Sequence, residues 1–230
     1  MNTESPNYQK AIETISKVVK LDKLDKKSKK ELYWLRAGLQ AESQVAYQLK
    51  SYFGNDDHFC VLNNFSFVLN DQMYQIDHMV LSHRAIYLIE SKSVSDVITV
   101  NEYEEWFRGK YKEPMNSPVS QVARQREGLE HYLYEHRDAY FAKLLGLRKN
   151  LNALIYKCYV AVSEKGKITG KGRKKQSDTV LKFDAIALKI KATHKELNPG
   201  DVQLAGQFPV DTFKGARITR TIVGWNSNAE

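Results

Sequence analysis

Two apolar runs that carry charged residues near their ends, QIDHMVLS and AIYLIESK within residues 75–92, constrain the fold more than any other feature. Their content of Met, Val, Leu, Ile and Tyr predicts two buried β-strands, and the short connection at His83 and Arg84 predicts an antiparallel hairpin. Asp77 lies near the start of the first run, and Glu90 and Lys92 lie near the end of the second. Because a buried carboxylate is costly unless it is paired, protonated or bound to a metal, these acids require a partner.

The hairpin register predicts which residues face one another. Counting outward from the turn gives the pairs Ser82 with Ala85, Val80 with Tyr87, His78 with Ile89, and Asp77 with Glu90. Directly opposite residues share a face with Cβ atoms about 5 Å apart, and Lys92 lies two residues beyond Glu90 on the same face. Two crowded carboxylates are typical ligands of a divalent cation such as Mg²⁺. The register therefore predicts a metal site, and a simple surface ion pair stays open as the alternative.

A third acid, Glu42, belongs to a predicted helix that precedes the strands. Ser28 and Glu31 form a capping-box pattern at its start, and Gly54 can end it. Leu35, Val45 and Leu49 fall on one face of this helix, and Glu42 falls on that face too. Alone, Glu42 is typical of a residue at the core boundary, but its coincidence with the hairpin acids favours a shared site.

The remaining pattern predicts one α/β domain with an N-terminal helical extension, divided at residues 1–30 and 31–230. Residues 7–21 have the spacing of a short amphipathic helix, and strand-like runs follow Gly54 as an antiparallel meander. Ser117 and Pro118 start a further helix that we expect to reach about Leu145. Two later strands are expected at ALIYKCYVAV and VLKFDAIALKI, with a Gly- and Lys-rich exposed loop between them.

Charge and composition favour a polyanionic partner. The formal net charge is +8, and the expected phosphate contacts are the loop residues and one helix residue, namely Lys171, Arg173, Lys174, Lys175 and Arg124. A solvated loop without a ligand stays open for the first four. Cys60 and Cys158 are expected to be core thiols. Because no apolar stretch is long enough for a membrane span and the N-terminus lacks an apolar signal core, we expect no membrane partner and a cytoplasmic location.

The order of these motifs resembles a known family. A helix with Glu42 is followed by QIDH, by IESK, by a strand with Trp106, and by a Pro-x-x-Gln element at Pro118 and Gln121. This order, over roughly residues 38–133, is similar to the NERD or nuclease-related domain, which is assigned to the PD-(D/E)xK nuclease superfamily. Ser93 stands where relatives often have Asn. The resemblance implies a restriction-endonuclease-like core of α+β type, in which helices flank a central mixed or antiparallel sheet.

The resemblance also implies roles for five residues. Asp77 and Glu90 would ligate Mg²⁺ or Mn²⁺, with Glu42 as a direct or water-mediated contact. Lys92 would orient or deprotonate the attacking water and offset charge on the phosphate. Gln121 would contact the water, the phosphate or Lys92.

These features predict a metal-dependent deoxyribonuclease that serves DNA processing or defence against foreign DNA. A non-catalytic module that binds nucleic acid or protein through a nuclease-like fold is the alternative, and a scaffold with a buried ion network is a third interpretation. The sequence does not decide whether the substrate is DNA or RNA, or whether the protein acts as an endonuclease or an exonuclease. It also leaves open whether the chain forms a homodimer or binds a protein partner.

Overall fold

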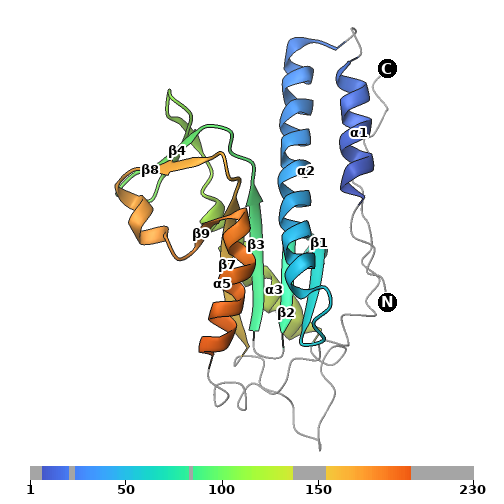
Figure 1. Cartoon of the computed structure of the whole chain (residues 1–230), viewed down its shortest axis with the longest axis vertical. Helices are drawn as coiled ribbons and strands as arrows, with labels where there is room; N and C mark the ends of the chain where they lie inside the picture. Colours follow the sequence, from blue (N-terminus) through green and yellow to red (C-terminus); the bar gives the residue numbers. More distant parts are fainter. Residues whose placement is uncertain (1–6, 21–23, 83–84, 137–153, 198–230) are drawn as a thin grey trace, which may run out of the picture.

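A five-stranded mixed sheet forms the centre of the computed structural model, which describes residues 7–20, 24–82, 85–136 and 154–197. Its strand order is β1-β2-β3-β7-β9 (Figure 1). The strands are β1 (Phe59–Leu69), β2 (Gln72–Ser82), β3 (Ala85–Lys92), β7 (Ile155–Val162) and β9 (Val180–Lys182). The first three form the predicted antiparallel meander, and β7 and β9 continue the sheet in parallel. The predicted mixed sheet flanked by helices is therefore confirmed.

The register of the β2–β3 hairpin agrees with the count from the sequence. His78 pairs with Ile89 and Val80 pairs with Tyr87, as predicted. The regular ladder ends at His78 and Ile89, one residue short of the predicted pair of Asp77 with Glu90. The turn at residues 83 and 84 lies outside the described residues.

Helices cover both faces of the sheet and create two separate cores. The helix α3 (Pro118–Glu135) packs on one face, where Val122 and Leu129 contact strand residues such as Leu88. On the other face, α2 (Lys26–Phe53) and α5 (Phe183–Glu196) lie side by side (Figure 1). Val45 of α2 and Ile186 of α5 join the second core there. The sheet is thus buried on both sides, as its nearly continuous apolar strands require.

The long helix α2 starts earlier than the sequence predicted. Its N-cap is Asp25, whose Oδ1 accepts hydrogen bonds from the backbone N–H groups of Lys27 and Ser28. The Ser28 capping box was therefore wrong, because an aspartate three residues upstream satisfies two of the free N–H groups at the helix start. Gly54 ends the helix as expected. The preceding helix α1 (Tyr8–Val19) packs beside α2 (Figure 1).

The predicted start of α3 is confirmed. Ser117 is the N-cap, its Oγ accepts a hydrogen bond from the Ser120 backbone N–H, and Pro118 occupies the first turn. The helix ends at Glu135, and the predicted continuation over residues 137–145 lies outside the described residues.

The Gly- and Lys-rich segment was expected to be an exposed loop, but most of it has regular structure. A four-stranded sheet has the order β6-β5-β4-β8 and consists of β4 (Val97–Val100), β5 (Trp106–Arg108), β6 (Glu113–Met115) and β8 (Lys167–Thr169). The 3₁₀ helix η2 (Lys171–Gln176) follows β8. A Cβ on Gly170 would lie 2.1 Å from the carbonyl oxygen of Val100, so glycine allows this segment to pack tightly on β4. β4 pairs in the antiparallel sense with β5, the strand that contains Trp106.

The expected strand at residues 180–190 was wrong beyond its first residues. Only Val180–Lys182 is a strand, and α5 begins at Phe183. The β-branched residues of segment 180–190 favoured a strand. However, four of its residues recur at helical spacing and are buried against the sheet, namely Phe183, Ile186, Ala187 and Ile190.

Three smaller predictions concern cysteines, membranes and domains. Cys60 is buried in the core and Cys158 packs against it, as expected of core thiols, and burial raises the pKa of Cys158 to about 11. None of the helices in the described ranges is both long and apolar enough to cross a membrane. The division into residues 1–30 and 31–230 stays a prediction.

Candidate active site

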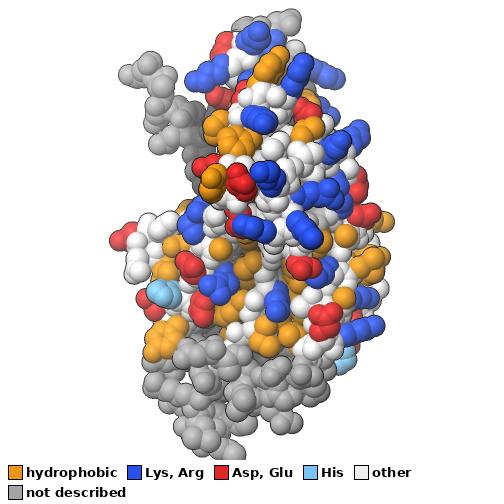
Figure 2. Space-filling view, turned by 90° about the vertical axis from the view of Figure 1, so that its left-hand side faces the viewer, with side chains coloured by type: hydrophobic (Ala, Val, Ile, Leu, Met, Phe, Trp, Pro, Cys, Tyr) orange, Lys and Arg blue, Asp and Glu red, His pale blue; other side chains and the backbone are white. Residues whose placement is uncertain are grey.

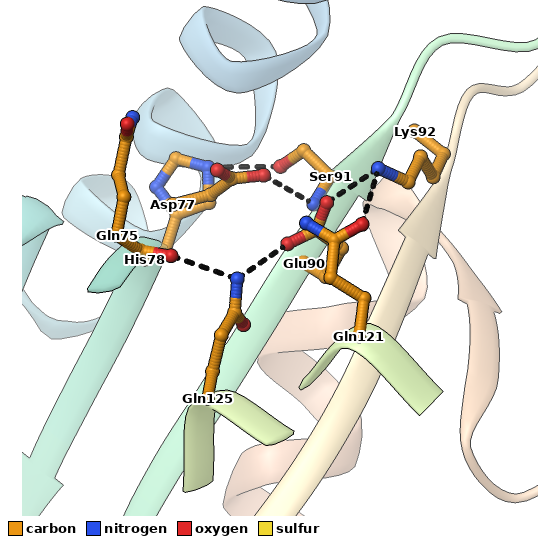
Figure 3. A network of polar contacts seen from close by, with 8 residues as sticks. All are labelled: Gln75, Asp77, His78, Glu90, Ser91, Lys92, Gln121 and Gln125. Atoms are coloured by element: carbon orange, nitrogen blue, oxygen red, sulfur yellow. Dashed lines mark hydrogen bonds and ion pairs between the residues drawn. The ribbon is translucent and has the colours of Figure 1, made fainter. Parts of the chain in front are cut away.

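The site forms at the end of β3, where a buried acid meets a lysine. The Glu90 side chain is 2% exposed, and its Oε1 lies 2.5 Å from Lys92 Nζ. Lys92 Nζ also donates to Gln121 Oε1 at 3.1 Å (Figure 3). Glu90 and Lys92 share a strand face because they are two residues apart, and α3 places Gln121 over that face. The sequence therefore identified three residues that the fold brings into direct contact.

Gln125 completes the contacts of Glu90 and was missed from the sequence. Its Nε2 donates to Glu90 Oε2 at 3.0 Å and to the backbone carbonyl of Gln75 at 2.8 Å (Figure 3). Its Oε1 is buried and has no hydrogen-bond partner within the described ranges. The available signal was its position four residues after Gln121, which places both amides on one face of α3.

Asp77 lies beside this group at the adjoining end of β2. Its Oδ2 accepts a hydrogen bond from the Ser91 backbone N–H at 2.8 Å (Figure 3). Burial, and then the charges of Glu90 and Glu42, raise the pKa of Asp77 well above its usual value despite that hydrogen bond. The carboxyl group of Asp77 is therefore close enough to both acids to be affected by them.

Glu42 approaches the site from α2, on the other side of the sheet from α3. Burial, and then the charge of Glu90, raise the pKa of Glu42 to about 7, while Lys92 opposes the shift. The Glu42 side chain is partly buried. Within the described part of the chain, no hydrogen bond or ion pair engages its carboxylate. The expected inward position of Glu42 agrees with this environment.

His78 contacts the site through Ser91. It is completely buried, and its Nδ1 donates to Asn63 Oδ1 at 2.7 Å, so its Nε2 accepts from Ser91 Oγ at 2.9 Å. Burial lowers the pKa of His78 to about 3, which keeps the ring neutral. The His78 side chain is thus packed inside the protein. Its contact with Ser91 holds the residue whose backbone N–H binds Asp77.

The acids at this site have the chemistry of a hard-cation site. Among the described residues, no three His, Cys, Asp or Glu side chains are already arranged as a metal cluster. However, Asp77, Glu90 and Glu42 offer only carboxylate oxygens, and burial followed by the charge of Glu90 raises the pKa of both Asp77 and Glu42. Carboxylate oxygens are the ligands of Mg²⁺ and Mn²⁺. The unpaired Gln125 Oε1 is a further polar atom that water beside a cation can satisfy. These oxygen donors are of the chemical type that hard divalent cations take.

Comparison with protein families identifies the chain. The model of the nuclease-related domain, NERD, matches residues 37–163, which is more than half of the chain. The chain belongs to the NERD family. The resemblance inferred from the motifs is confirmed, and the matched segment contains Glu42, Asp77, Glu90, Lys92 and Gln121. Neither the curated proteins nor the solved structures that were searched gave a match.

An open groove adjoins the NERD site. It has a volume of about 620 Å³ and lies between the end of the β1–β2 hairpin and α3. Gln75, Gln121 and Gln125 line both this groove and the site, and Arg124 lines the groove further along α3. Tyr74 and Gly128 both line the groove and pack closely against each other, because a Cβ atom on Gly128 would lie 2.4 Å from the Tyr74 ring. Of the predicted phosphate contacts, Arg124 therefore lines a groove that it shares with residues of the site.

The other predicted phosphate contacts lie on η2, beside β4, and are exposed. Lys171 forms an ion pair with Glu102 at 3.3 Å, and Lys175 lies 3.9 Å from Glu104. In Figure 2, Lys and Arg side chains on this side of the molecule are interspersed with Asp and Glu side chains rather than gathered in one patch. Within the described residues, no ion pair engages Arg173 or Lys174, so these two retain uncompensated charge.

Proposed function

We propose that this NERD protein is a metal-dependent nuclease that hydrolyses phosphodiester bonds of DNA, with Mg²⁺ or Mn²⁺ as its cation. The observation that supports the proposal most is the buried contact of Glu90 with Lys92 beside Asp77. A structural ion pair needs one acid and one base. Here three acids surround one lysine, an arrangement that is costly for the fold unless a cation joins them.

The residues divide the chemistry between them. Asp77 and Glu90 would hold the cation, with Glu42 as a third carboxylate. A bound divalent cation polarises the phosphoryl group and lowers the pKa of water. Lys92 supplies positive charge where negative charge develops on the phosphate. Gln121 restricts the Lys92 ammonium through its 3.1 Å hydrogen bond, and it presents an amide N–H to a phosphate oxygen or a water.

We further propose that the groove beside the site carries the nucleic acid. Its amide side chains can bind sugar and phosphate oxygens, and Arg124 can pair with a phosphate. The exposed charges of Arg173 and Lys174 would add affinity without sequence specificity. A cytoplasmic role in DNA processing or defence against foreign DNA, with a catalytic domain at residues 31–230, completes this proposal. Association as a homodimer or with a protein partner stays open.

One observation favours a second candidate, a NERD module that binds nucleic acid or protein without cleaving it. Glu90 is already neutralised by Lys92, and the described residues contain no preformed three-ligand cluster. In that case the raised pKa values of Asp77 and Glu42 lower their negative charge, and no cation is required.

A cleavage assay separates the two candidates. Supercoiled, linear and single-stranded DNA, and RNA of matched sequence, are incubated with the protein in Mg²⁺, in Mn²⁺ or in EDTA. The nuclease proposal expects cleavage that requires the cation and is abolished in Asp77→Asn, a variant of nearly the same size. Substrate binding without cleavage in either metal would favour the binding module.

A further inference from the structure

A buried tyrosine of the N-terminal helix α1 has a side-chain hydroxyl group with no hydrogen-bond partner among the described residues. Tyr8 is the first residue of α1 and is 7% exposed. It shares a helix face with the buried Ile15, two turns later, and α1 packs beside α2 (Figure 1). The segment that matches the NERD model begins at residue 37, so Tyr8 lies outside it.

The hydroxyl group of Tyr8 lacks a partner. Its oxygen is buried, and no atom of the described residues forms a hydrogen bond with it. A phenol hydroxyl has one donor and can accept hydrogen bonds as well. Buried polar atoms are nearly always satisfied by protein or by ordered water. The Tyr8 hydroxyl therefore requires a partner that is neither a side chain nor a backbone group of the described structure.

The charges around Tyr8 indicate where that partner lies. Burial raises the pKa of Tyr8, and the negative charges of Glu42 and Asp77 raise it further. The hydroxyl is therefore near the two acids, although neither of them accepts its proton in a hydrogen bond.

We propose that Tyr8 is part of the cation site and that its hydroxyl oxygen accepts a hydrogen bond from a water molecule of the cation's hydration shell. Mg²⁺ in proteins keeps several of its waters, and these waters are strong hydrogen-bond donors that need acceptors. Asp77 and Glu90, with Glu42 as a third carboxylate, would hold the cation, and the neutral oxygen of Tyr8 would orient its water without adding a further charge. This inference rests on the proposed cation site.

The arrangement gives the N-terminal helix a role beyond packing. Ile15 anchors α1, and Tyr8 brings a polar atom from that helix to the acids of the NERD core. Tyr8 is therefore a positioning residue, since it acts on the cation through water. Its loss should affect cation binding while leaving the metal-free fold intact.

The test is Tyr8→Phe, which removes one oxygen and keeps the ring. Mn²⁺ binding is measured by calorimetry on the full chain, and we expect the Kd to rise about 3- to 10-fold, the usual contribution of one hydrogen bond. The melting temperature without metal should stay equal or rise, because an unsatisfied buried hydroxyl is removed. Tyr47→Phe, at a 70% exposed tyrosine of α2, and Ile15→Val, which loosens α1 without removing a polar atom, are the controls.

Each other outcome overturns the inference. If wild-type protein binds Mn²⁺ and Tyr8→Phe binds it equally well, Tyr8 is not part of the site, while the proposed function stands. If Ile15→Val weakens Mn²⁺ binding as much, the effect comes from helix packing. A lower metal-free melting temperature of Tyr8→Phe would show that the hydroxyl has a protein partner. Absence of Mn²⁺ binding in wild-type protein would remove the proposed cation site together with this inference.

Discussion

Glu90 and Lys92 form an ion pair at 2.5 Å in which the glutamate side chain is 2% exposed and the lysine side chain is 27% exposed. The lysine thus reaches toward solvent while its partner is completely enclosed by β3 and α3. A buried carboxylate tolerates this position because Lys92 and Gln125 both donate to it. The relationship places a partly exposed positive charge beside a buried carboxylate.

The raised pKa of Glu42 predicts how stability depends on pH. Glu42 binds a proton more tightly in the folded state, with a pKa of about 7 against 4.5 when unfolded. The resulting stabilisation is complete below about pH 4.5 and is lost as the pH rises through about 7. Relative to Glu42→Gln, metal-free wild-type protein should therefore lose on the order of 3 kcal/mol of unfolding free energy over this window. Urea unfolding at several pH values measures the difference, and a difference that is constant with pH would contradict it.

His78 should matter for stability and not for titration near neutral pH. His78→Leu leaves Asn63 Oδ1 and Ser91 Oγ without their buried partner, which should cost about 2 kcal/mol of unfolding free energy. Urea denaturation checks this value. His131→Leu, at an exposed histidine, should change the unfolding free energy little. Equal effects of the two substitutions would show that the His78 contacts contribute nothing specific.

The exposed cations of η2 should contribute affinity that depends on salt. Alanine at both Arg173 and Lys174 should reduce the magnitude of the slope of log K against log salt for duplex DNA by about 1 to 2. The reason is that binding with fewer phosphate contacts releases fewer counterions from the DNA. The same change at Lys171 and Lys175 should have a smaller effect, since acidic neighbours already pair with them. Fluorescence anisotropy over a salt series measures the slopes. An unchanged slope in both variants would place η2 away from the nucleic acid.

Glu90 and Lys92 should differ in their effect on metal binding. Glu90→Ala removes a carboxylate oxygen and should abolish calorimetric Mn²⁺ binding. Lys92→Ala should keep Mn²⁺ binding, because a protonated amine is not a ligand for a hard cation. Loss of binding in Lys92→Ala alone would contradict the assigned roles.

Local sequence patterns correctly predicted those elements that are determined by residues close together in the sequence. The register of His78 with Ile89 follows from the length of the hairpin turn, and the start of α3 follows from Ser117 and Pro118. The strand predicted at residues 180–190 failed because a run of apolar and β-branched residues does not distinguish a buried strand from a buried helix.

Site residues could be predicted from the sequence only where they belong to one strand segment or to one recognisable motif. Glu90 and Lys92 are two residues apart on β3 and share one face of that strand, so their contact follows from the spacing. Gln125 and Tyr8 reach the site through the packing of α3 and α1 on other elements, which no local pattern specifies. The spacing of residues 7–21 predicted a short amphipathic helix, but it did not single out Tyr8.

The most direct test of the account is the rate at which Lys92→Ala cleaves supercoiled DNA at saturating Mn²⁺, compared with wild-type protein under the same conditions. Lys92 supplies the positive charge at the phosphate, so its removal should lower the rate about 100-fold or more, as losses of a single charge-stabilising group do. Binding of Mn²⁺ in the variant ensures that the loss is one of chemistry. If Lys92→Ala cleaves at the wild-type rate, these residues do not form the nuclease site, and the binding-module interpretation replaces it.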